Sequence, residues 1–266
     1  MKSSTEDNVI TDTFDISTEP IITPEMVYGE RGELCKTCIV TFSDMILKNA
    51  IEKHGFKQIA KISVCNGDIP IYGAEIDGRM IALYLSPIGS GGAGNFVIES
   101  SWITGADNYV MFGSAGCLDS EAVLGKLVLP TFAYRDEGMS YHYAAAGDYI
   151  RIKGSEFVKG IFDRMHIPYV EGRVWTTDAM YRETRLNMQR RRAEGCLAVE
   201  MELAGVQAVC DFHKLNLYNF LMVGDVLDLP EWESGELQNA NHSLDNFELA
   251  LKIACECDRS ENCGQG

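Results

Sequence analysis

The apolar positions of this chain fall into short runs separated by polar, glycine-containing stretches, a pattern that predicts alternating strands and helices. Short apolar or β-branched runs are typical of buried strands, whereas longer stretches with apolar residues every three or four positions are typical of helices. The predicted strands are residues 37–42, 61–65, 69–76, 80–85, 109–112, 126–130, 170–176 and 217–223. The predicted helices are residues 44–54, 95–104, 156–166, 197–212 and 246–254.

Local signals support several of these boundaries. Asp44 and Ser155 stand at helix N-cap positions, where a side-chain oxygen can accept from the first free backbone N–H groups. Glycine-rich segments at 89–94 and 113–116 follow predicted strands, and glycine there lets backbone N–H groups approach an anion or a sugar. We expect turns at both segments.

Strands alternating with helices along 266 residues favour a single three-layer α/β/α domain with a mixed central sheet. Residues 1–33 are polar and acidic with scattered prolines, and they predict an N-terminal arm. Residues 34–266 form the predicted domain.

Composition narrows the class of partner. The formal net charge of -16, from 23 basic and 39 acidic residues, disfavours binding to the phosphate backbone of nucleic acids. No apolar run approaches the roughly 20 residues of a membrane span, and the N-terminal sequence does not resemble a signal peptide. We therefore expect a cytoplasmic protein that acts on a small molecule and binds neither nucleic acid nor membrane.

Nine cysteines raise the alternatives of disulfides or zinc. Cys35 and Cys38 form a CxxC motif, but no second pair follows at zinc-finger spacing, and an odd count does not suit a complete disulfide framework. The interpretation favoured here is reduced thiols, no metal and no cofactor.

The most informative pattern is a pair of carboxylates around a methionine, Glu200-Met201-Glu202, at the start of an apolar helical run. On a helix, side chains two positions apart point to different faces, so one of the two can easily reach solvent. The other needs a partner that offsets its desolvation, such as the hydroxyls of a ligand. Asp225 closes the run 217–223, where an α/β protein places the carboxyl end of a strand and its ligand.

Five segments in order carry a resemblance to a known family. They are GSAG at 113–116, RDEGMSYHY at 135–143, TTDAMY at 176–181, VEMELAG at 199–205 and VGDVLD at 223–228. Together they resemble the nucleoside phosphorylase family, which includes uridine and purine nucleoside phosphorylases and related nucleosidases. The resemblance spans about residues 37–255, and VEMELAG is its most specific segment.

The resemblance implies roles for the matching residues. Glu202 would bind the ribose, because its two carboxylate oxygens can accept hydrogen bonds from both the 2′- and 3′-hydroxyls. Met201 would pack on the sugar. Met180 and Tyr181 would line the base pocket. Asp225 would protonate the leaving base, as in purine-cleaving members; the structural alternative is a helix N-cap after the strand.

The nucleophile site departs from the family pattern, in which arginines hold phosphate. The arginine before the GSAG segment is replaced by Met111, and the one from a neighbouring subunit aligns near Gly67. Ser114 and Gly113 would still lie beside the nucleophile. A phosphorylase would have to rebuild its phosphate site from Ser114, Lys48 and the glycine-rich backbone that includes Gly91.

Three functions therefore remain open. Phosphorolysis would use phosphate as co-substrate and give free base and ribose 1-phosphate, as family membership favours. Hydrolysis would use water and a general base, for which Asp44 and Glu99 are candidates by position. A non-catalytic nucleoside-binding protein is disfavoured, because both Glu202 and Asp225 are retained.

The sequence leaves the base open, with a purine, a modified nucleoside or uracil as the alternatives. Asp225 favours a purine, whereas RDEGMSYHY resembles the uridine branch. The glutamine and arginine that read uracil are not evident after Tyr181, so a purine is favoured and uridine stays possible. The resemblance also implies a homo-oligomer, either a dimer or a hexamer, with sites at dimer interfaces.

Overall fold

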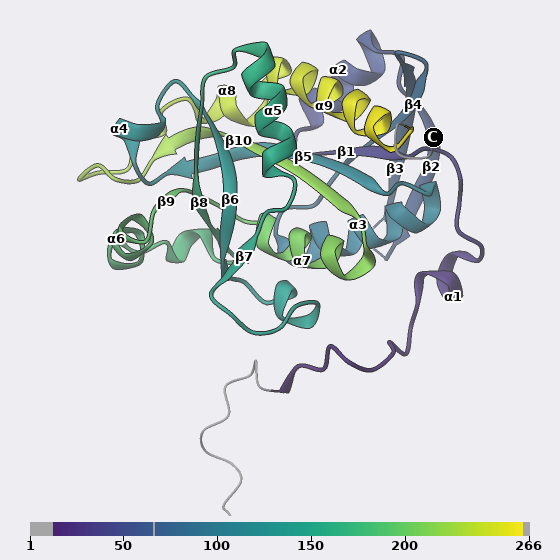
Figure 1. Cartoon of the computed structure of the whole chain (residues 1–266), viewed down its shortest axis with the longest axis horizontal. Helices are drawn as coiled ribbons and strands as arrows, with labels where there is room; N and C mark the ends of the chain where they lie inside the picture. The colour runs from purple at the N-terminus through teal and green to yellow at the C-terminus, as the bar shows by residue number, and fades with distance from the viewer. Residues whose placement is uncertain (1–12, 66, 263–266) are drawn as a thin grey trace, which may run out of the picture.

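The structure is a computed structural model that describes residues 13–65 and 67–262 (Figure 1). In this described part, ten strands form one mixed sheet with helices on both faces. The strand order is β10-β6-β8-β9-β5-β1-β4-β3-β2, and β7 pairs with β6 outside this path. The predicted three-layer α/β/α architecture is confirmed.

The strands have the following bounds. They are β1 Thr37–Thr41, β2 Lys57–Val64, β3 Gly67–Ile76, β4 Arg79–Leu85, β5 Asn108–Cys117, β6 Leu127–Asp136, β7 Tyr149–Arg151, β8 Tyr169–Thr177, β9 Cys196–Glu200 and β10 Asn216–Val226.

The helices are α1 Pro24–Tyr28, α2 Asp44–Lys53, α3 Ser90–Thr104, α4 Ser120–Val123, α5 Ser155–Met165, α6 Arg185–Ala193, α7 Leu203–His213, α8 Leu237–Asn241 and α9 Leu244–Asn262. Two 3₁₀ turns, η2 Met139–His142 and η3 Met180–Arg182, follow β6 and β8.

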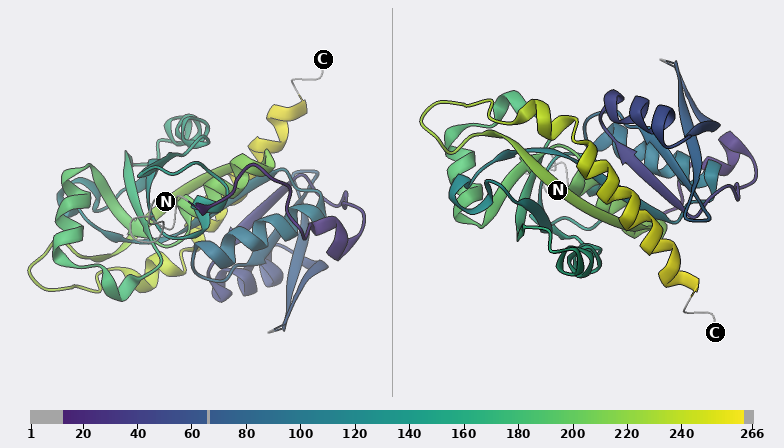
Figure 2. Two further views of the ribbon diagram at one scale, coloured as in Figure 1. Left: turned by 90° about the horizontal axis from the view of Figure 1, so that it is seen from below. Right: turned by 90° about the horizontal axis from the view of Figure 1, so that it is seen from above.

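Helices α3 and α7 lie on one face of the sheet, and α2, α5 and α9 lie on the other (Figures 1 and 2). Val97 of α3 and Val206 of α7 belong to one apolar core, whereas Phe162 of α5 and Phe247 of α9 belong to a second. Helices α3 and α7 approach closely at Gly205, where a Cβ would come within 2.6 Å of the Ser90 Cβ. A side chain at this glycine would push the two helices apart.

Three parallel strands place their carboxyl ends at one edge of the sheet. Met111 of β5 is paired with Val40 of β1 on one side and with Asn219 of β10 on the other. Strand β10 also pairs with β6, so β10, β6, β8, β9 and β5 form a closed ring of pairings. Glu200 at the end of β9 and Asp225 near the end of β10 both line one cavity.

The predicted helix at 197–212 is wrong in its first turn. Residues 196–200 form β9, because Val199 pairs with Trp175 of β8 and with Gly116 of β5. Helix α7 begins only at Leu203. The pairing of β9 with its two neighbouring strands outweighs the helical pattern of residues 197–200.

The two expected glycine turns are also corrected. Residues 113–116 continue β5, because residues 221–223 of β10 pair with residues 113–115 and Val199 of β9 pairs with Gly116. Helix α3 begins at Ser90 rather than at Asn95, so most of the first glycine segment is helical. Glycine composition marked the close packing at both places and not a turn.

Two helix caps differ by one residue from the prediction. Ser43 caps α2, where its Oγ accepts from the Ile46 N–H at 3.2 Å, and Asp44 is the first helical residue. Gly154 occupies the N-cap of α5, and the Ser155 hydroxyl donates to the Ile152 carbonyl.

The predicted arm lies partly outside the described residues, which begin at residue 13. Its described part runs along the outside of the body and carries the short helix α1 (Figure 2). Arg31 pairs with Asp107 at 2.5 Å, and the Trp102 indole donates to the Gly29 carbonyl at 2.8 Å. None of the helices in the described ranges has the length and apolar character to cross a membrane.

Candidate active site

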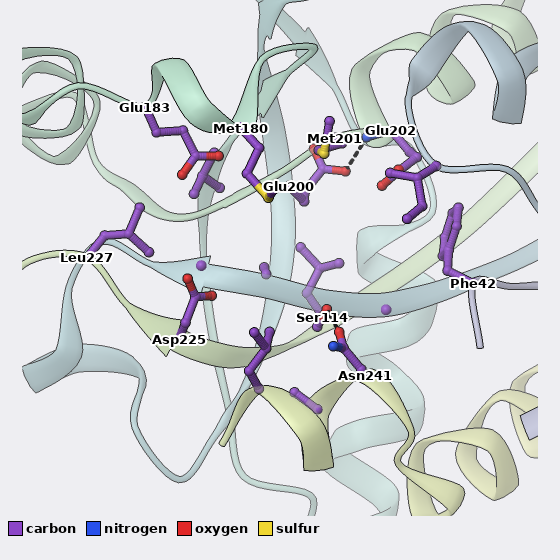
Figure 3. Close-up of a pocket in the computed structure, with 18 of the residues that line it drawn as sticks. Phe42, Ser114, Met180, Glu183, Glu200, Met201, Glu202, Asp225, Leu227 and Asn241 are labelled. Carbon is purple, nitrogen blue, oxygen red and sulfur yellow. Dashed lines mark hydrogen bonds between the residues drawn. The ribbon is translucent and has the colours of Figure 1, made fainter. Parts of the chain in front are cut away.

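A cavity of about 810 Å³ lies where β5, β9 and β10 end, and it is large enough for a small organic ligand. The β5 segment, the turn between β9 and α7, η3, and helix α8 supply its walls (Figure 3). The predicted site residues that line it are Gly113, Ser114, Met180, Tyr181, Met201, Glu202 and Asp225. The sequence therefore identified residues that the fold brings together from four separate segments.

Lys48 and Gly91 are not among the lining residues. Lys48 lies on the exposed side of α2, where its Nζ pairs with Asp44 at 2.7 Å. Gly91 is the second residue of α3. The glycine that contributes a donor is Gly89, whose N–H donates to Glu202 Oε1 at 2.6 Å.

The two glutamates of the β9–α7 turn are both buried, with 6% of Glu200 and 9% of Glu202 exposed. Neither reaches solvent as the helical interpretation required. Glu200 Oε2 accepts from the N–H groups of Glu202 and Leu203 at 2.8 and 2.7 Å, and its Oε1 accepts from the Thr176 hydroxyl. Glu200 thus satisfies the first free N–H groups of α7, which leaves Glu202 to face the cavity.

Burial raises the pKa of both glutamates. For Glu200, desolvation is the largest cause and the charge of Glu202 adds to it, while its three donors act in the opposite direction. For Glu202, desolvation also dominates and the Gly89 N–H opposes it. A ligand with hydroxyl donors at Glu202 would favour the ionised form of this carboxyl.

The opposite end of the cavity carries a second pair of acids, Glu183 and Asp225, which face each other in Figure 3. The Trp232 indole N–H donates to Asp225 Oδ2 at 2.8 Å. Asp225 lies within β10, so its side chain is not a helix N-cap. Burial, and then the charge of Asp225, raise the pKa of Glu183 to about 7.

Between these ends, helix α8 reaches the edge of the sheet. Asn241 accepts through Oδ1 from the Ser114 hydroxyl, and His242 Nδ1 lies 2.7 Å from Ser43 Oγ. Deeper in the cavity, Asn219 is 1% exposed and donates to the Met111 carbonyl at 2.9 Å. Its acceptor oxygen, Oδ1, is buried without a hydrogen-bond partner.

The cavity lining is acidic. Within the described chain, its carboxyl groups are Glu183, Glu200, Glu202 and Asp225, and its one lysine or arginine is Arg185. The Arg185 guanidinium donates to the carbonyls of Leu229 and Pro230 at 2.5 and 2.7 Å. No group of three or more His, Cys, Asp or Glu among the described residues has a geometry suited to a metal ion.

The residues expected to hold the base lie at the cavity mouth. Met180 is 48% exposed and Tyr181 is 93% exposed, so both are free to close over a flat ring. The general-base candidates Asp44 and Glu99 are engaged elsewhere. Asp44 pairs with Lys48, and Glu99 accepts from the Tyr28 hydroxyl at 2.5 Å.

Several lining residues were missed by the sequence analysis: Phe42, Glu183, Asn219, Trp232, Asn241 and His242. Asn241 ends the short helix α8 and His242 is its C-cap, and no local pattern links them to Ser114 or Ser43. Glu183 follows Tyr181 in the charged sequence Arg182-Glu183-Thr184-Arg185. Its position two residues after Tyr181, a predicted base-pocket residue, was the one signal that could have identified it as a site residue.

Comparison with known proteins identifies the family of this chain. The model of the phosphorylase superfamily matches residues 36–257. A DeoD-type purine nucleoside phosphorylase of Exiguobacterium sibiricum is 26% identical over 163 residues, covering 57% of this chain and 64% of that protein. Its counterpart from Exiguobacterium sp. strain ATCC BAA-1283 / AT1b is 23% identical over 241 residues, covering 86% of this chain and 94% of that protein.

Solved structures share the fold. A futalosine hydrolase mutant of Helicobacter pylori superposes with a TM-score of 0.66 at 17% identity, covering 82% of this chain and 98% of that one. AMP nucleosidase from Bacteroides thetaiotaomicron gives 0.65 at 18% identity, covering 86% and 91%. The chain belongs to the phosphorylase superfamily. It is an enzyme of the nucleoside phosphorylase and nucleosidase class, which includes both phosphorolysis and hydrolysis.

Proposed function

We propose that this enzyme hydrolyses the N-glycosidic bond of purine nucleosides, with water as the acceptor, and releases free base and ribose. The observation that carries the proposal is the lack of a free lysine or arginine in the described lining of the cavity. Four carboxyl groups line it, and the guanidinium of Arg185 is bound to backbone carbonyls. A phosphate dianion requires charged, preferably bidentate donors, whereas water does not.

The two acidic ends of the cavity suit the two halves of a nucleoside. Cleavage of the C1′–N bond builds positive charge on the sugar ring and negative charge on the leaving base. Glu202 would accept from the ribose hydroxyls and lie beside the developing cation, with Met201 packed on the sugar. Asp225 would donate a proton to a ring nitrogen of the base, which Met180 and Tyr181 would cover.

The region of the missing arginine also suits water. Met111 is uncharged, and the neighbouring Asn219 presents a buried acceptor oxygen that has no partner. An acceptor of this kind is satisfied by a water or hydroxyl group that donates to it, and it repels the oxygens of a phosphate dianion.

Phosphorolysis remains the second candidate, because the two sequence relatives described above are named as purine nucleoside phosphorylases. In that case Ser114 and backbone N–H groups would hold the phosphate. Neither Lys48 nor Gly91 lines the cavity to assist.

The choice of base is tested with purified enzyme, adenosine, inosine, guanosine and uridine in phosphate-free buffer, with chromatographic detection of free base. The proposal expects release of at least one purine base at a rate well above that of uracil. Release of uracil alone, or saturable binding of all four without any cleavage, would contradict it.

A further inference from the structure

Asn241, the last residue of helix α8, and His242, the C-cap that follows it, each bond to a serine that lies on or just after one of two neighbouring parallel strands. Strands β1 and β5 are parallel neighbours, with Val40 paired with Met111, and Ser43 follows the end of β1 as the N-cap of α2. Asn241 bonds Ser114, and His242 bonds Ser43. His242 thus lines the same cavity as Ser114, the residue predicted to lie beside the nucleophile.

We infer that His242 is the general base of the hydrolysis, taking a proton from the water that attacks C1′. The inference rests on the proposed function, because only a hydrolase needs a base for water. Asp44 and Glu99 do not line the cavity, whereas His242 is a half-buried titratable group within it. The buried Glu200 is committed to the N-terminus of α7, and Glu202 to the sugar.

The hydrogen bonds of Ser43 allow this role. Ser43 Oγ already accepts from the Ile46 N–H at 3.2 Å, and its second lone pair can accept from Nδ1–H of His242 at 2.7 Å. This tautomer leaves Nε2 as an acceptor for the water proton, and the bond to Ser43 persists when the ring becomes cationic. Asp44, at the start of α2, lies near enough for the charge of His242 to contribute to the lowered pKa of Asp44, after the larger effect of Lys48.

The step balances without any additional reactant. The water oxygen bonds to C1′ as the C1′–N bond breaks, and the bonding electron pair leaves with the base. The proton of Asp225 passes to a ring nitrogen of the base, and a water proton passes to His242 Nε2. Exchange with solvent then returns both side chains to their starting states.

The test uses His242→Asn, His242→Ala and the control His166→Asn, assayed with adenosine and inosine. Asparagine can keep a hydrogen bond to Ser43 Oγ but cannot take up a proton, so His242→Asn separates positioning from base catalysis. His166 is the control because it lies at the C-terminus of α5 with a φ of 55°, a conformation that asparagine also tolerates.

We expect kcat to fall by about 10²–10⁴-fold in both His242 variants, as for loss of a general base, and to stay unchanged in His166→Asn. Added imidazole should restore part of the activity of His242→Ala, where it has room to bind, and none of that of His242→Asn. An unchanged kcat in His242→Asn, or a loss of activity in both His242 variants without rescue by imidazole, would overturn this inference and leave the proposed function standing. Base release by the wild-type enzyme only in the presence of phosphate, or no release at all, would overturn the proposed function and this inference with it.

Discussion

Asp225 and Trp232 form the hydrogen bond that positions the proposed acid, and the pair is open to a specific test. In Asp225→Asn, the amide oxygen can still accept from the Trp232 indole, but the proton for the leaving base is gone. We expect kcat on inosine to fall by about 10²–10⁴-fold. Thermal unfolding should be nearly unchanged.

A substrate with a good leaving group provides the control. p-Nitrophenyl β-D-ribofuranoside releases a phenolate that needs no proton, so Asp225→Asn should cleave it at close to the wild-type rate. Equal losses on inosine and on the nitrophenyl riboside would show that Asp225 supports the cavity and does not act as the acid.

Glu183 predicts how activity depends on pH. Its pKa is raised to about 7 by burial and by Asp225, so it is neutral below this pH and ionised above it. Ionisation places a negative charge where charge develops on the leaving base. We expect kcat to decline as pH rises above about 7, and Glu183→Gln, which stays neutral, to lose this decline.

The pH dependence of thermal stability gives an independent measure of the ionisation of Glu183. The folded-state pKa of Glu183 lies above its ordinary value of 4.5, so its contribution to stability falls as pH rises from about 4.5 to 7. The melting temperature of Glu183→Gln relative to wild type should therefore increase over that range. An identical alkaline decline of kcat in both proteins would assign the pH dependence to another group.

The sequence predicted the site residues that lie within specific local motifs, such as Glu202 in VEMELAG and Asp225 at the end of an apolar run. It did not predict His242, Asn241 or Asn219. These side chains reach the cavity because α8 folds back onto β5 and because β10 pairs with Met111. Such contacts join residues more than 100 positions apart, and no local spacing encodes them.

At the scale of elements, the β9–α7 turn is held by Glu200. Glu200→Ala would leave the buried N–H groups of Glu202 and Leu203 without an acceptor, and we expect a loss of about 2–3 kcal/mol in the free energy of unfolding. Glu200→Gln keeps an acceptor oxygen for both groups and removes the repulsion from Glu202. It should lose less than about 1 kcal/mol.

Urea unfolding followed by circular dichroism measures both variants, with an unchanged m value as the check that the unfolding transition is the same. Equal destabilisation by alanine and glutamine would mean that the charge of Glu200, and not its acceptor geometry, holds the turn.

The same turn shows why the helix boundary was predicted wrongly. The run Leu197–Val199 is compatible with either a strand or a helix, and its pairing with β8 and β5 decides for the strand. By contrast, α2 and α5 were predicted to within about one or two residues, because each carries an amphipathic pattern that packs against one face of the sheet.

At the scale of the whole molecule, the formal net charge of -16 repels anionic substrates. We expect kcat/KM for adenosine to exceed that for AMP by about tenfold or more, which corresponds to about 1.4 kcal/mol. The difference should shrink as salt is raised, because screening weakens the repulsion. Steady-state rates at low and high ionic strength would reveal it, and a preference for AMP would contradict the electrostatic account.

The three-layer fold was predictable because strands and helices alternate along the chain and each has an apolar face to bury. The closed ring of β10, β6, β8, β9 and β5 was not, since it depends on β10 pairing with two strands at once. That ring sets Glu183 and Asp225 opposite each other and places Glu202 at the other end of the cavity.

The most direct test of the central claim is the initial rate of purine release from inosine, measured without phosphate and with phosphate up to about 50 mM. The sugar product is identified in the same reactions. The account predicts a rate independent of phosphate and free ribose as the product at every concentration. A rate that rises from zero with phosphate, accompanied by ribose 1-phosphate, would contradict it and assign the enzyme to the phosphorylases.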